Sequence, residues 1–563
     1  MDAKNHYTIG IDFDTKLARG VLVNVNNGQF AANVDFLYPH GVINHRLPDL
    51  DVELEPGWAL FHPNDFIDAI KQIVPKLMRV SQVEVEQIIG IGIAATGSTL
   101  IPTKKDGTPL CLLDEYRHEP HAWPKLWTHT GSTEKAFLLS QLANDRFETF
   151  LDRYGGKIDP EWFFPKVWEL YENASSIYNA ADRLIEAADW IVWQLTGVEK
   201  RNLCAAGYKA LWSKTEGFPL ETFFAAMDPH LTKVIDKKMK REITPLGEQV
   251  GELTEEAATW MNLSPGIPVA TGLLNSYAAV PASTVAQPGK MALILGSNFS
   301  HLILSNKEFH VPGMSGMVQD GIVPGLIGYE AIQSGGGNLV SWFMNNAIPK
   351  KYFKKAQERN ISINQLMEEK ASELQPAESG MVALDWWNAN RSILADDDLT
   401  GLILGYSIQT TPEEIYRTLL EATTFGTRKI FETFIASGIP INEIIVSGDN
   451  LVKNELLLNI LANVTRMEIK TVASPYTAAL GSAMFAAVAA GEKSGGYATV
   501  QDASKKMAHL DEKTFFPNNT DKKTYNRLYS EYTLLHDYFG YGHNNAMKRL
   551  KNLRTTILEK KNR

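Results

Sequence analysis

Apolar segments at the N-terminus are separated by short polar turns, a pattern that predicts β-strands. Three such segments are rich in β-forming residues: Tyr7 to Phe13, Gly20 to Val25 and Phe30 to Leu37. Pro63 to Val74 has apolar residues at helical spacing and predicts a helix. Gln87 to Ala95 predicts a further buried strand, which ends in Thr96-Gly97-Ser98-Thr99. The pattern is that of a meander opening an α/β domain.

From His118 to Ala258 the apolar spacing is mainly helical. The clearest predicted helices are Thr133–Leu142, Pro165–Glu172 and Ala180–Leu195. Three histidines near the start of this region, His118, His121 and His129, lack the spacing of a paired metal-ligand motif. We therefore expect structural roles for them.

A residue pattern typical of β-strands returns at Pro268. Val269 to Leu274 predicts a short strand, and Asn275-Ser276 offers an N-cap for a small-residue helix that begins at Tyr277. Open α/β sheets bind ligands where strands end and helices begin, so this stretch is a candidate site. The alternative is that Asn275 only caps a helix.

The C-terminal half repeats the opening pattern. Lys290 to Leu295 predicts a strand, Gly296 to Ser300 a turn and His301 to Leu304 a returning strand, which echoes the first hairpin and indicates two domains of like topology. The glycines Gly335 to Gly337 follow no obvious strand. Further predicted elements are helices over Pro412–Ser437, Asn454–Val464, Ala478–Ala490 and Lys523–Leu558, and strands over Glu443–Ser447 and Met467–Thr471.

Composition narrows the class of protein. The 563 residues are 44% hydrophobic, contain no apolar run of membrane-spanning length and carry a formal net charge of −10. We therefore expect a protein that binds neither a membrane nor nucleic acid, with the basic run from Arg549 to Arg563 as a solvated helix face. Two cysteines and an N-terminus without an apolar leader indicate the cytoplasm.

Four predicted strand ends carry groups suited to phosphate or metal chemistry: Asp12–Thr15, Asn275-Ser276, Gly296–Ser300 and Gly448–Asn450. Phosphate is bound by backbone N–H groups in tight turns and by hydroxyls, and a metal ion needs a carboxylate such as that of Asp12. Each could instead be an ordinary turn that closes a strand. No P-loop is present, because Gly289-Lys290 is followed by Met291.

Several blocks of the sequence, in order, resemble the FGGY carbohydrate kinases, and within them the ribulokinase branch. The blocks are Gly156–Ile158, Phe163–Lys166, Glu186–Trp190, Ala206–Ala210, Gly328–Ala331, Asn390–Ser392, Glu421–Lys429 and Leu535–Gly540. They extend over almost the whole chain, which makes the resemblance specific.

The resemblance implies two actin/RNase H-like ATPase domains with the active-site cleft between them. We expect a sugar-binding domain over residues 1–267, a nucleotide-binding domain over 268–500 and a helical extension over 501–563. The implied reaction transfers the γ-phosphoryl group of Mg-ATP to a ketopentose such as L-ribulose, and the family often forms homodimers.

The resemblance also implies roles for single residues. The expected sugar-binding residues are Gly97, Lys209, Asn275 and Glu330. The expected nucleotide-binding residues are Asp12, Asp14, Thr15, Gly296, Ser297, Gly448, Asp449 and Asn454, and Asp12 is also the expected Mg²⁺ ligand.

The chain departs from the family pattern inside this implied site. Asn275 stands where the family has its catalytic aspartate, Tyr277 where ribulokinases have histidine, and Asp14 and Asp449 where the family has glycines. An amide cannot accept the proton of a sugar hydroxyl, and general-base catalysis contributes typically ~10²–10⁴-fold in rate. Two hypotheses follow: a ribulokinase-like sugar kinase, or a non-catalytic relative that binds a sugar or sugar phosphate as a sensor or partner protein.

Overall fold

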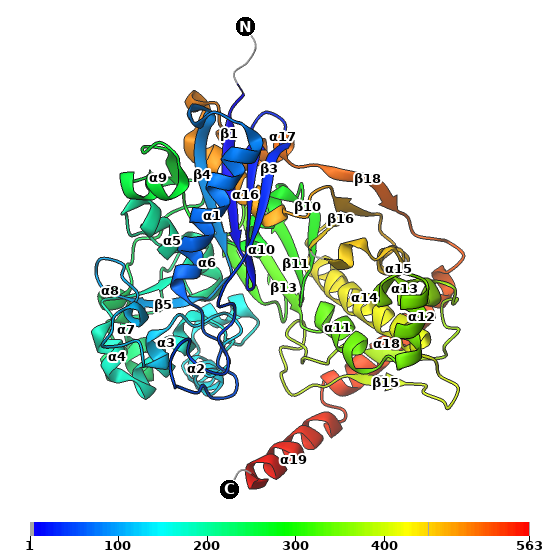
Figure 1. Cartoon of the computed structure of the whole chain (residues 1–563). Coiled ribbons are helices and arrows are strands. Elements are labelled where there is room, and N and C mark those ends of the chain that lie inside the picture. The colour runs from blue at the N-terminus through cyan, green and yellow to red at the C-terminus, as the bar shows by residue number, and fades with distance from the viewer. Residues whose placement is uncertain (1–4, 449, 562–563) are drawn as a thin grey trace. The chain divides into compact units, whose positions relative to one another are not determined.

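The computed structural model describes residues 5–448 and 450–561 and divides the chain into two compact units (Figure 1). The first unit comprises residues 1–287, 316–328 and 476–509, and the second comprises 288–315, 329–475 and 510–563. These units cut the chain elsewhere than the expected boundaries after residues 267 and 500. The difference arises because residues 268–287 and 476–509 supply strands and helices that pack on the N-terminal sheet.

The first unit is built on a mixed sheet with strand order β3-β2-β1-β4-β8-β7, to which β9 adds beside β4. The strands are β1 (Tyr7–Phe13), β2 (Leu17–Asn24), β3 (Phe30–Leu37), β4 (Ile88–Ala95), β7 (Gln249–Glu252), β8 (Pro268–Ala270) and β9 (Leu273–Leu274). β1, β2 and β3 form the expected antiparallel meander, and β4 pairs with β1 in parallel. Every residue of β4 is buried, as its continuous apolar run predicts.

Helix α16 (Thr477–Ala490) comes from late in the chain yet packs directly on β1 and β4 of the first unit. The approach is close because glycines face it: a Cβ at Gly10 or Gly92 would overlap backbone atoms of α16. On its other side α16 packs on α10 (Asn275–Ala282), where a Cβ at Gly481 would overlap the carbonyl of Ala278. These small residues bring the helix that begins at Asn275 against the sheet.

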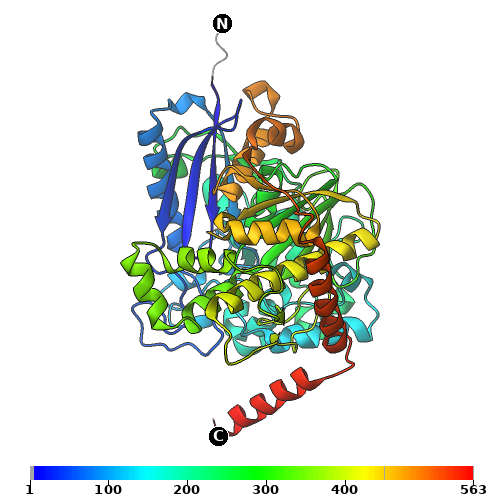
Figure 2. The same cartoon turned by 90° about the vertical axis from the view of Figure 1, so that its right-hand side faces the viewer.

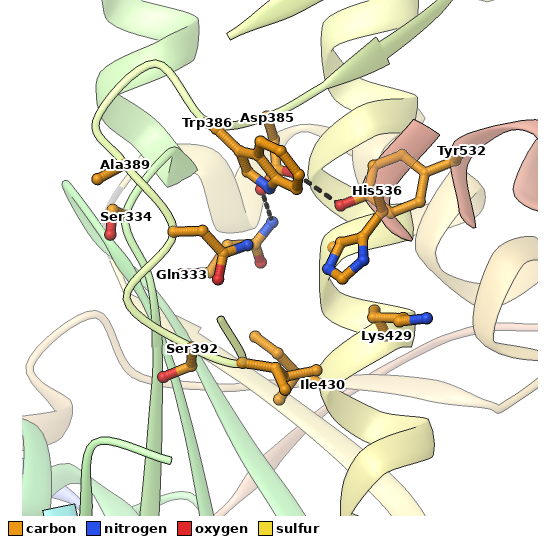
Figure 3. Close-up of a pocket in the computed structure, with 13 residues that line it drawn as sticks. Gln333, Ser334, Asp385, Trp386, Ala389, Ser392, Lys429, Ile430, Tyr532 and His536 are labelled. Carbon is orange, nitrogen blue, oxygen red and sulfur yellow. Dashed lines mark hydrogen bonds between the residues drawn. The ribbon is translucent and has the colours of Figure 1, made fainter. Parts of the chain in front are cut away.

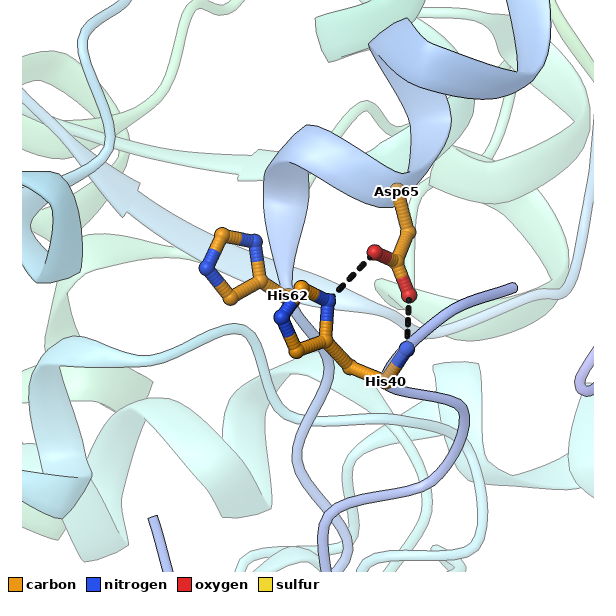
Figure 4. A group of neighbouring side chains, drawn as sticks. All are labelled: His40, His62 and Asp65. Atoms are coloured by element: carbon orange, nitrogen blue, oxygen red, sulfur yellow. Dashed lines mark hydrogen bonds and ion pairs between the residues drawn. The ribbon is translucent and has the colours of Figure 1, made fainter. Parts of the chain in front are cut away.

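The residues at the start of helix α1 (Pro63–Ser81) explain why the helix begins there. His62 caps it, because its Nδ1 accepts the N–H of Asn64 at 3.2 Å, and Pro63 occupies the first turn. The buried carboxylate of Asp65 accepts the Nδ1–H of His40 at 2.6 Å, which ties the preceding loop to the helix (Figure 4). The imidazole rings of His40 and His62 stack, with centroids 4.1 Å apart.

The helical region of the first unit follows the prediction with one correction. The structure has α2 (Thr133–Asp145), α3 (Phe163–Asn173) and α5 (Ala187–Thr196). The expected helix over Ala180–Leu195 is wrong in its first half, where Arg183–Glu186 forms strand β6 paired antiparallel with β5 (Leu100–Thr103). Pairing with β5 overrides the local helical spacing of this short segment.

The second unit repeats the arrangement of the first. Its sheet has the order β13-β11-β10-β16-β17-β18, with β10 antiparallel to β11 and parallel to β16. The strands are β10 (Gly289–Leu295), β11 (Phe299–Ser305), β13 (Ile327–Gln333), β16 (Ile441–Gly448), β17 (Ile469–Val472) and β18 (Leu510–Phe515). The expected echo of the first hairpin is therefore present in the sheet topology.

Helices α11 (Gly336–Asn346), α14 (Pro412–Ala436) and α15 (Glu455–Thr465) belong to the second unit. The expected single helix over Lys523–Leu558 is instead two, α18 (Lys522–Gly540) and α19 (Ala546–Lys561), which Figure 2 shows at an angle to each other. Tyr525, Tyr529 and Tyr532 of α18 are buried, whereas Tyr538 is exposed. Within the described residues, no helix combines the length and apolar character needed to cross a membrane.

Candidate active site

One edge of the first sheet gathers three of the residues expected in the site. The register places Asp12 of β1 beside Ala94 of β4, and Ala94 beside Leu273 of β9, with all three strands parallel. Gly97 follows β4 and Asn275 follows β9. Because carboxyl ends of parallel strands meet at one edge, Asp12, Gly97 and Asn275 lie along the same edge, where α/β sheets bind ligands.

The turn between β1 and β2 is closed by its own side chains. The N–H of Thr15 donates to Oδ1 of Asp14 at 2.7 Å, and Oδ2 of Asp14 lies 3.7 Å from Nη1 of Arg19. The hydroxyl of Thr15 accepts a hydrogen bond from Nε1 of Trp127 at 2.9 Å. Asp12, at the end of β1, is 4% exposed. The turn thus holds a carboxylate beside the N–H and hydroxyl groups that could otherwise face a phosphate.

The loop after β4 is held in place by hydrogen bonds from a buried lysine. Nζ of Lys166 donates to the carbonyls of Ser98 at 2.6 Å and Leu126 at 2.7 Å. Burial lowers the pKa of Lys166 to about 7, although nearby carboxylates oppose the shift. A Cβ at Gly97 would lie 3.0 Å from Leu274, so a larger side chain there would press on the strand that leads to Asn275.

Asn275 is the first residue of α10 rather than its N-cap, which corrects the expectation from sequence. Leu274 is the capping residue, and it makes no side-chain cap. Oδ1 of Asn275 accepts the N–H of Ser276 at 2.8 Å. The pairing of Leu274 with Ala95 extends the strand up to the helix, which leaves no room for a separate capping residue. Asn275 is half-buried at the sheet edge.

Lys209 is the last residue of a short helix, α6 (Leu203–Lys209). The start of this helix is fixed by a set of buried hydrogen bonds. Oδ1 of Asn202 accepts the N–H of Ala205 at 2.7 Å, and Oδ1 of Asp189 accepts both the N–H and the Nδ2–H of Asn202. Burial raises the pKa of Asp189 to about 6. These hydrogen bonds set the position of α6 and therefore of Lys209.

The second unit presents a turn of a different kind between β10 and β11. The N–H of Gly296 donates to the carbonyl of Asn298 at 3.1 Å, and the carbonyls of Gly296 and Ser297 accept N–H groups from the first turn of α11. The side chain of Ser297 is exposed. Gly335 to Gly337 do follow a strand, β13, which corrects the sequence reading; a Cβ at Gly337 would lie 2.5 Å from the carbonyl oxygen of Gly296.

The remaining residues expected in the second unit differ in what they do. Gly448 ends β16 in register with Leu295, has a φ of +128° and leaves no space for a Cβ. Asn454 caps α15, since Oδ1 accepts the N–H of Leu457 at 2.9 Å while Nδ2 donates to Tyr416 at 2.8 Å. Glu330 lies in β13 and is 3% exposed. Asp449 lies outside the described residues.

A small polar pocket in the second unit contains none of the expected site residues, although part of its lining lies in the blocks Asn390–Ser392, Glu421–Lys429 and Leu535–Gly540 (Figure 3). At its centre the buried carboxylate of Asp385 accepts hydrogen bonds from Nε2 of Gln333 at 2.7 Å and from the hydroxyl of Tyr532 at 2.9 Å. Burial raises the pKa of Asp385. The pocket joins β13, α14 and α18 from three distant parts of the sequence, so no local pattern could have revealed it.

Two histidine groups outside this edge have structural roles. His40, His62 and Asp65 place ligand atoms within 4.8 Å of one another, but the two imidazoles are nearly parallel, at 11°. A metal ion at about 2.1 Å lies in the plane of each imidazole that binds it, and parallel planes do not meet at one ion. The group therefore serves to cap and anchor α1.

Of the three histidines noted in the sequence, His121 and His129 join a buried network and His118 is exposed. Glu169 binds Nζ of Lys125 at 2.7 Å and Nε2 of His129 at 3.0 Å. Burial lowers the pKa of His129 to about 4, which keeps the ring neutral. The network braces the helical layer and agrees with the expected structural role.

Comparisons with known proteins agree with this architecture. The chain matches the FGGY family of carbohydrate kinases, with the N-terminal domain over residues 7–280 and the C-terminal domain over residues 291–490. It is 48% identical over 549 residues to the ribulokinase of Halalkalibacterium halodurans, covering 98% of both chains. It is 46% identical over 550 residues to that of Anoxybacillus flavithermus, covering 98% of this chain and 97% of the relative.

Solved structures share the fold at low sequence identity. The xylulose kinase of Rhodospirillum rubrum has a TM-score of 0.76 at 19% identity, covering 95% of this chain and 99% of that one. The gluconate kinase of Lactobacillus acidophilus has a TM-score of 0.75 at 17% identity, with 96% and 99% covered. The duplicated sheet is thus the two-domain, actin/RNase H-like fold of these sugar kinases, and the chain belongs to the FGGY family of carbohydrate kinases.

Proposed function

We propose that this protein is a sugar kinase that transfers the γ-phosphoryl group of ATP to a ketopentose, L-ribulose being the first candidate. The relatives that are nearly half identical over the full chain carry the name ribulokinase, and this supports the choice of sugar. The observation that carries the proposal is the edge of the first sheet. Asp12, Gly97 and Asn275 lie along it, and the lysine-bearing α6 packs against β9, the strand that leads to Asn275.

In this proposal the sugar is held by hydrogen bonds. The ammonium of Lys209 donates, the carboxylate of Glu330 accepts, and the amide of Asn275 can do both. The glycine at position 97 keeps side-chain bulk away from the edge beside Leu274. Such a set recognises hydroxyl and carbonyl groups of an uncharged sugar.

The residues of the second turn fit the phosphates of a nucleotide. Gly296 carries no side chain, Ser297 exposes its hydroxyl, and Gly448 brings bare backbone to the end of the neighbouring strand. A buried carboxylate such as that of Asp12 suits Mg²⁺, which prefers oxygen ligands. When bound, Mg-ATP supplies the phosphoryl group.

The turn between β1 and β2 disfavours the binding of an anion. The carboxylate of Asp14 holds the N–H of Thr15, and its charge is only partly offset by Arg19 at 3.7 Å. Two like charges ~4 Å apart repel by roughly 4 kcal/mol at an effective dielectric near 20. We therefore propose weak nucleotide binding that improves when this carboxylate is removed.

Turnover is expected to be slow. The sugar oxygen must attack the γ-phosphorus while the bond to the β-phosphate oxygen breaks, and the hydroxyl proton must leave. Asn275 cannot accept that proton, so the proton goes to water or to the phosphoryl oxygens, at a cost of ~10²–10⁴-fold in rate. The alternative of a non-catalytic sugar-binding relative rests on the departures at Asn275, Asp14 and Asp449, and none of the relatives named above supports it.

The test is direct. Purified protein is mixed with Mg-ATP and L-ribulose, and release of ADP is measured against the Asp12→Ala variant. We expect slow, sugar-dependent ADP release that is lost in the variant. Release no faster than in the variant, together with a sugar-induced rise in melting temperature, would instead support the non-catalytic relative.

Removal of the opposing charge tests the nucleotide half separately. Asp14→Gly is expected to tighten ATP binding by about ten-fold in calorimetry, since it removes a like charge from the turn. Asp35→Gly, at an exposed position of β3 in the same sheet, is the matched control and should leave binding unchanged. Equal ATP affinity in wild type and Asp14→Gly contradicts the charge argument. The expected homodimer remains a prediction, to be checked by light scattering.

A further inference from the structure

The ammonium group of Lys209 lies near the faces of two aromatic rings of the first unit. Its Nζ is 5.8 Å from the ring centroid of Trp162 and 5.8 Å from that of Tyr277. An ammonium within about 6 Å of an aromatic centroid is attracted by the ring face. The two rings come from segments more than a hundred residues apart, so only the fold brings them to one lysine.

Both rings are fixed by their own neighbours. Tyr277 is 2% exposed and stacks on Tyr208, with centroids 4.1 Å apart and planes 18° apart. Trp162 is 3% exposed and meets the edge of Tyr154, whose hydroxyl donates to the carbonyl of Gly207 at 2.5 Å. Because the rings are buried, they offer no free face to a ligand. The lysine side chain that lies near both rings is half-buried.

The same rings connect Lys209 to the sheet edge. Tyr277 lies two residues after Asn275 in the first turn of α10, and Tyr208 immediately precedes Lys209 in α6. The stack of Tyr277 on Tyr208 therefore joins the helix that starts at Asn275 to the helix that ends at Lys209.

A buried acid completes the surroundings of the lysine. Glu186 is 4% exposed, and burial raises the pKa of its carboxyl to about 8 while Lys166 and then Lys209 oppose the shift. Lys209 therefore lies within electrostatic range of the Glu186 carboxyl.

We propose that Trp162 and Tyr277 are positioning residues, which clamp the ammonium group of Lys209 between their faces and aim it at the sugar beside Asn275. The inference rests on the proposed function for the identity of the ligand, but the clamp itself is a property of the ligand-free protein. The rings restrict the rotamers of a four-carbon side chain before the sugar arrives, which lowers the entropic cost of binding.

The experiment measures the reactivity of Lys209 in the ligand-free protein. Lysines are labelled with acetic anhydride, and mass spectrometry gives the labelling rate at Lys209 relative to other lysines. Tyr277→Met and Trp162→Met each replace a ring by a flexible apolar side chain and are expected to raise the rate at Lys209 about three-fold. Tyr277→Phe and Trp162→Phe keep a ring and are expected to label as wild type does.

A matched control comes from the same unit. Nζ of Lys238 lies 4.7 Å from the ring centroid of Tyr178, which is 4% exposed and far from the sheet edge in sequence. Tyr178→Met removes a buried ring from a lysine in the same way and is expected to change labelling at Lys238 and not at Lys209. Equal rates at Lys209 in wild type, Tyr277→Met and Trp162→Met overturn the clamp.

One further variant covers the case in which the methionine variants do not fold. Pentafluorophenylalanine at position 277 keeps the shape of the phenylalanine variant and reverses the charge distribution of the ring. We expect faster labelling of Lys209 than in Tyr277→Phe, and no difference between the two would reject the clamp.

The sugar arm separates this inference from the proposed function. L-Ribulose is expected to protect Lys209 from labelling in wild type, and the methionine variants to raise KM for the sugar several-fold with a smaller change in kcat. A wild type that neither binds nor phosphorylates L-ribulose refutes the proposed sugar and leaves the ligand-free labelling result standing.

Discussion

The equivalent edges of the two sheets carry different chemical groups. In the first unit the edge carries side chains: Asp12 at the end of β1, Asp14 in the turn and Asn275 after β9. In the second unit the corresponding edge has Gly296 after β10, the exposed Ser297 beside it and Gly448 in register at the end of β16. The topology is shared, and the groups placed at the edge are not.

This difference between the two edges determines how a single substitution affects each of them. Chemistry that depends on a side chain changes with one residue, since an amide cannot accept a proton as a carboxylate can. Chemistry that depends on close backbone approach is protected differently, because Gly448 has a φ of +128° and no space for a Cβ. Substitution of Gly448 would therefore damage the fold as well as the site.

Restoring a carboxylate at the side-chain edge is expected to have the largest effect. Asn275→Asp should raise kcat for L-ribulose by ~10²–10⁴-fold, since it supplies a group that accepts the hydroxyl proton. The measurement is steady-state ADP release at saturating sugar and ATP. Asn275→Ser, which cannot act as a base, is the matched control. An equal rise in kcat in both variants would show that position 275 affects the rate through steric packing and not by accepting a proton.

Filling the backbone edge is expected to cost stability. Gly448→Ala should destabilise the protein by roughly 2 to 6 kcal/mol, because alanine is strained at this φ and its Cβ would overlap the carbonyl oxygen of Leu295. Gly296→Ala is the contrast, since the nearest atom to its Cβ would be 3.4 Å away. Urea unfolding of both variants checks this, and similar losses in the two would contradict the distinction.

The smallest expected effect concerns a buried histidine of the second sheet whose place in the first hairpin is taken by a glycine. His301 of β11 is fully buried, and Nε2 lies 3.2 Å from the hydroxyl of Thr427. Gly20 on β2 occupies the similar place in the first hairpin, and a Cβ there would overlap Ile73. Burial lowers the pKa of His301 to about 4.

The sign of the resulting pH dependence follows from that shift. The folded protein holds His301 neutral while the unfolded chain takes up a proton near pH 6.5, so its contribution is complete above pH 6.5 and is lost as pH falls toward 4. The loss at pH 5 is roughly 2 kcal/mol. His301→Gln should flatten the fall in melting temperature between pH 7 and pH 5, whereas His543→Gln, at an exposed position, should not.

Local pattern predicted most of the strands and the duplication. The runs Tyr7–Phe13 and Phe30–Leu37 form strands with the expected bounds, and the second hairpin lies one or two residues from its expected place. These elements are set by short-range alternation and by turn residues, which a sequence displays directly. Arg183–Glu186 was predicted wrongly because its pairing partner, β5, is about eighty residues away.

The candidate residues divide in the same way. Asp12 and Asn275 were singled out at predicted strand ends and Gly97 through the family resemblance, and the register brings the three to one edge. The clamp around Lys209 had no such signal, because Trp162 and Tyr277 meet the lysine from separate segments. The polar pocket around Asp385 was missed for the same reason.

The sequence by itself determined the identity of the groups available: an amide at position 275, a carboxylate at 14 and glycines at 296 and 448. It also determined the family, through blocks spread along the chain. Only the tertiary structure decided that the segment 476–509 completes the first unit, that Asn454 and His62 serve as helix caps, and that two buried rings flank Lys209. Side-chain chemistry is local to a residue, whereas burial and neighbours depend on contacts between segments that are far apart in the chain.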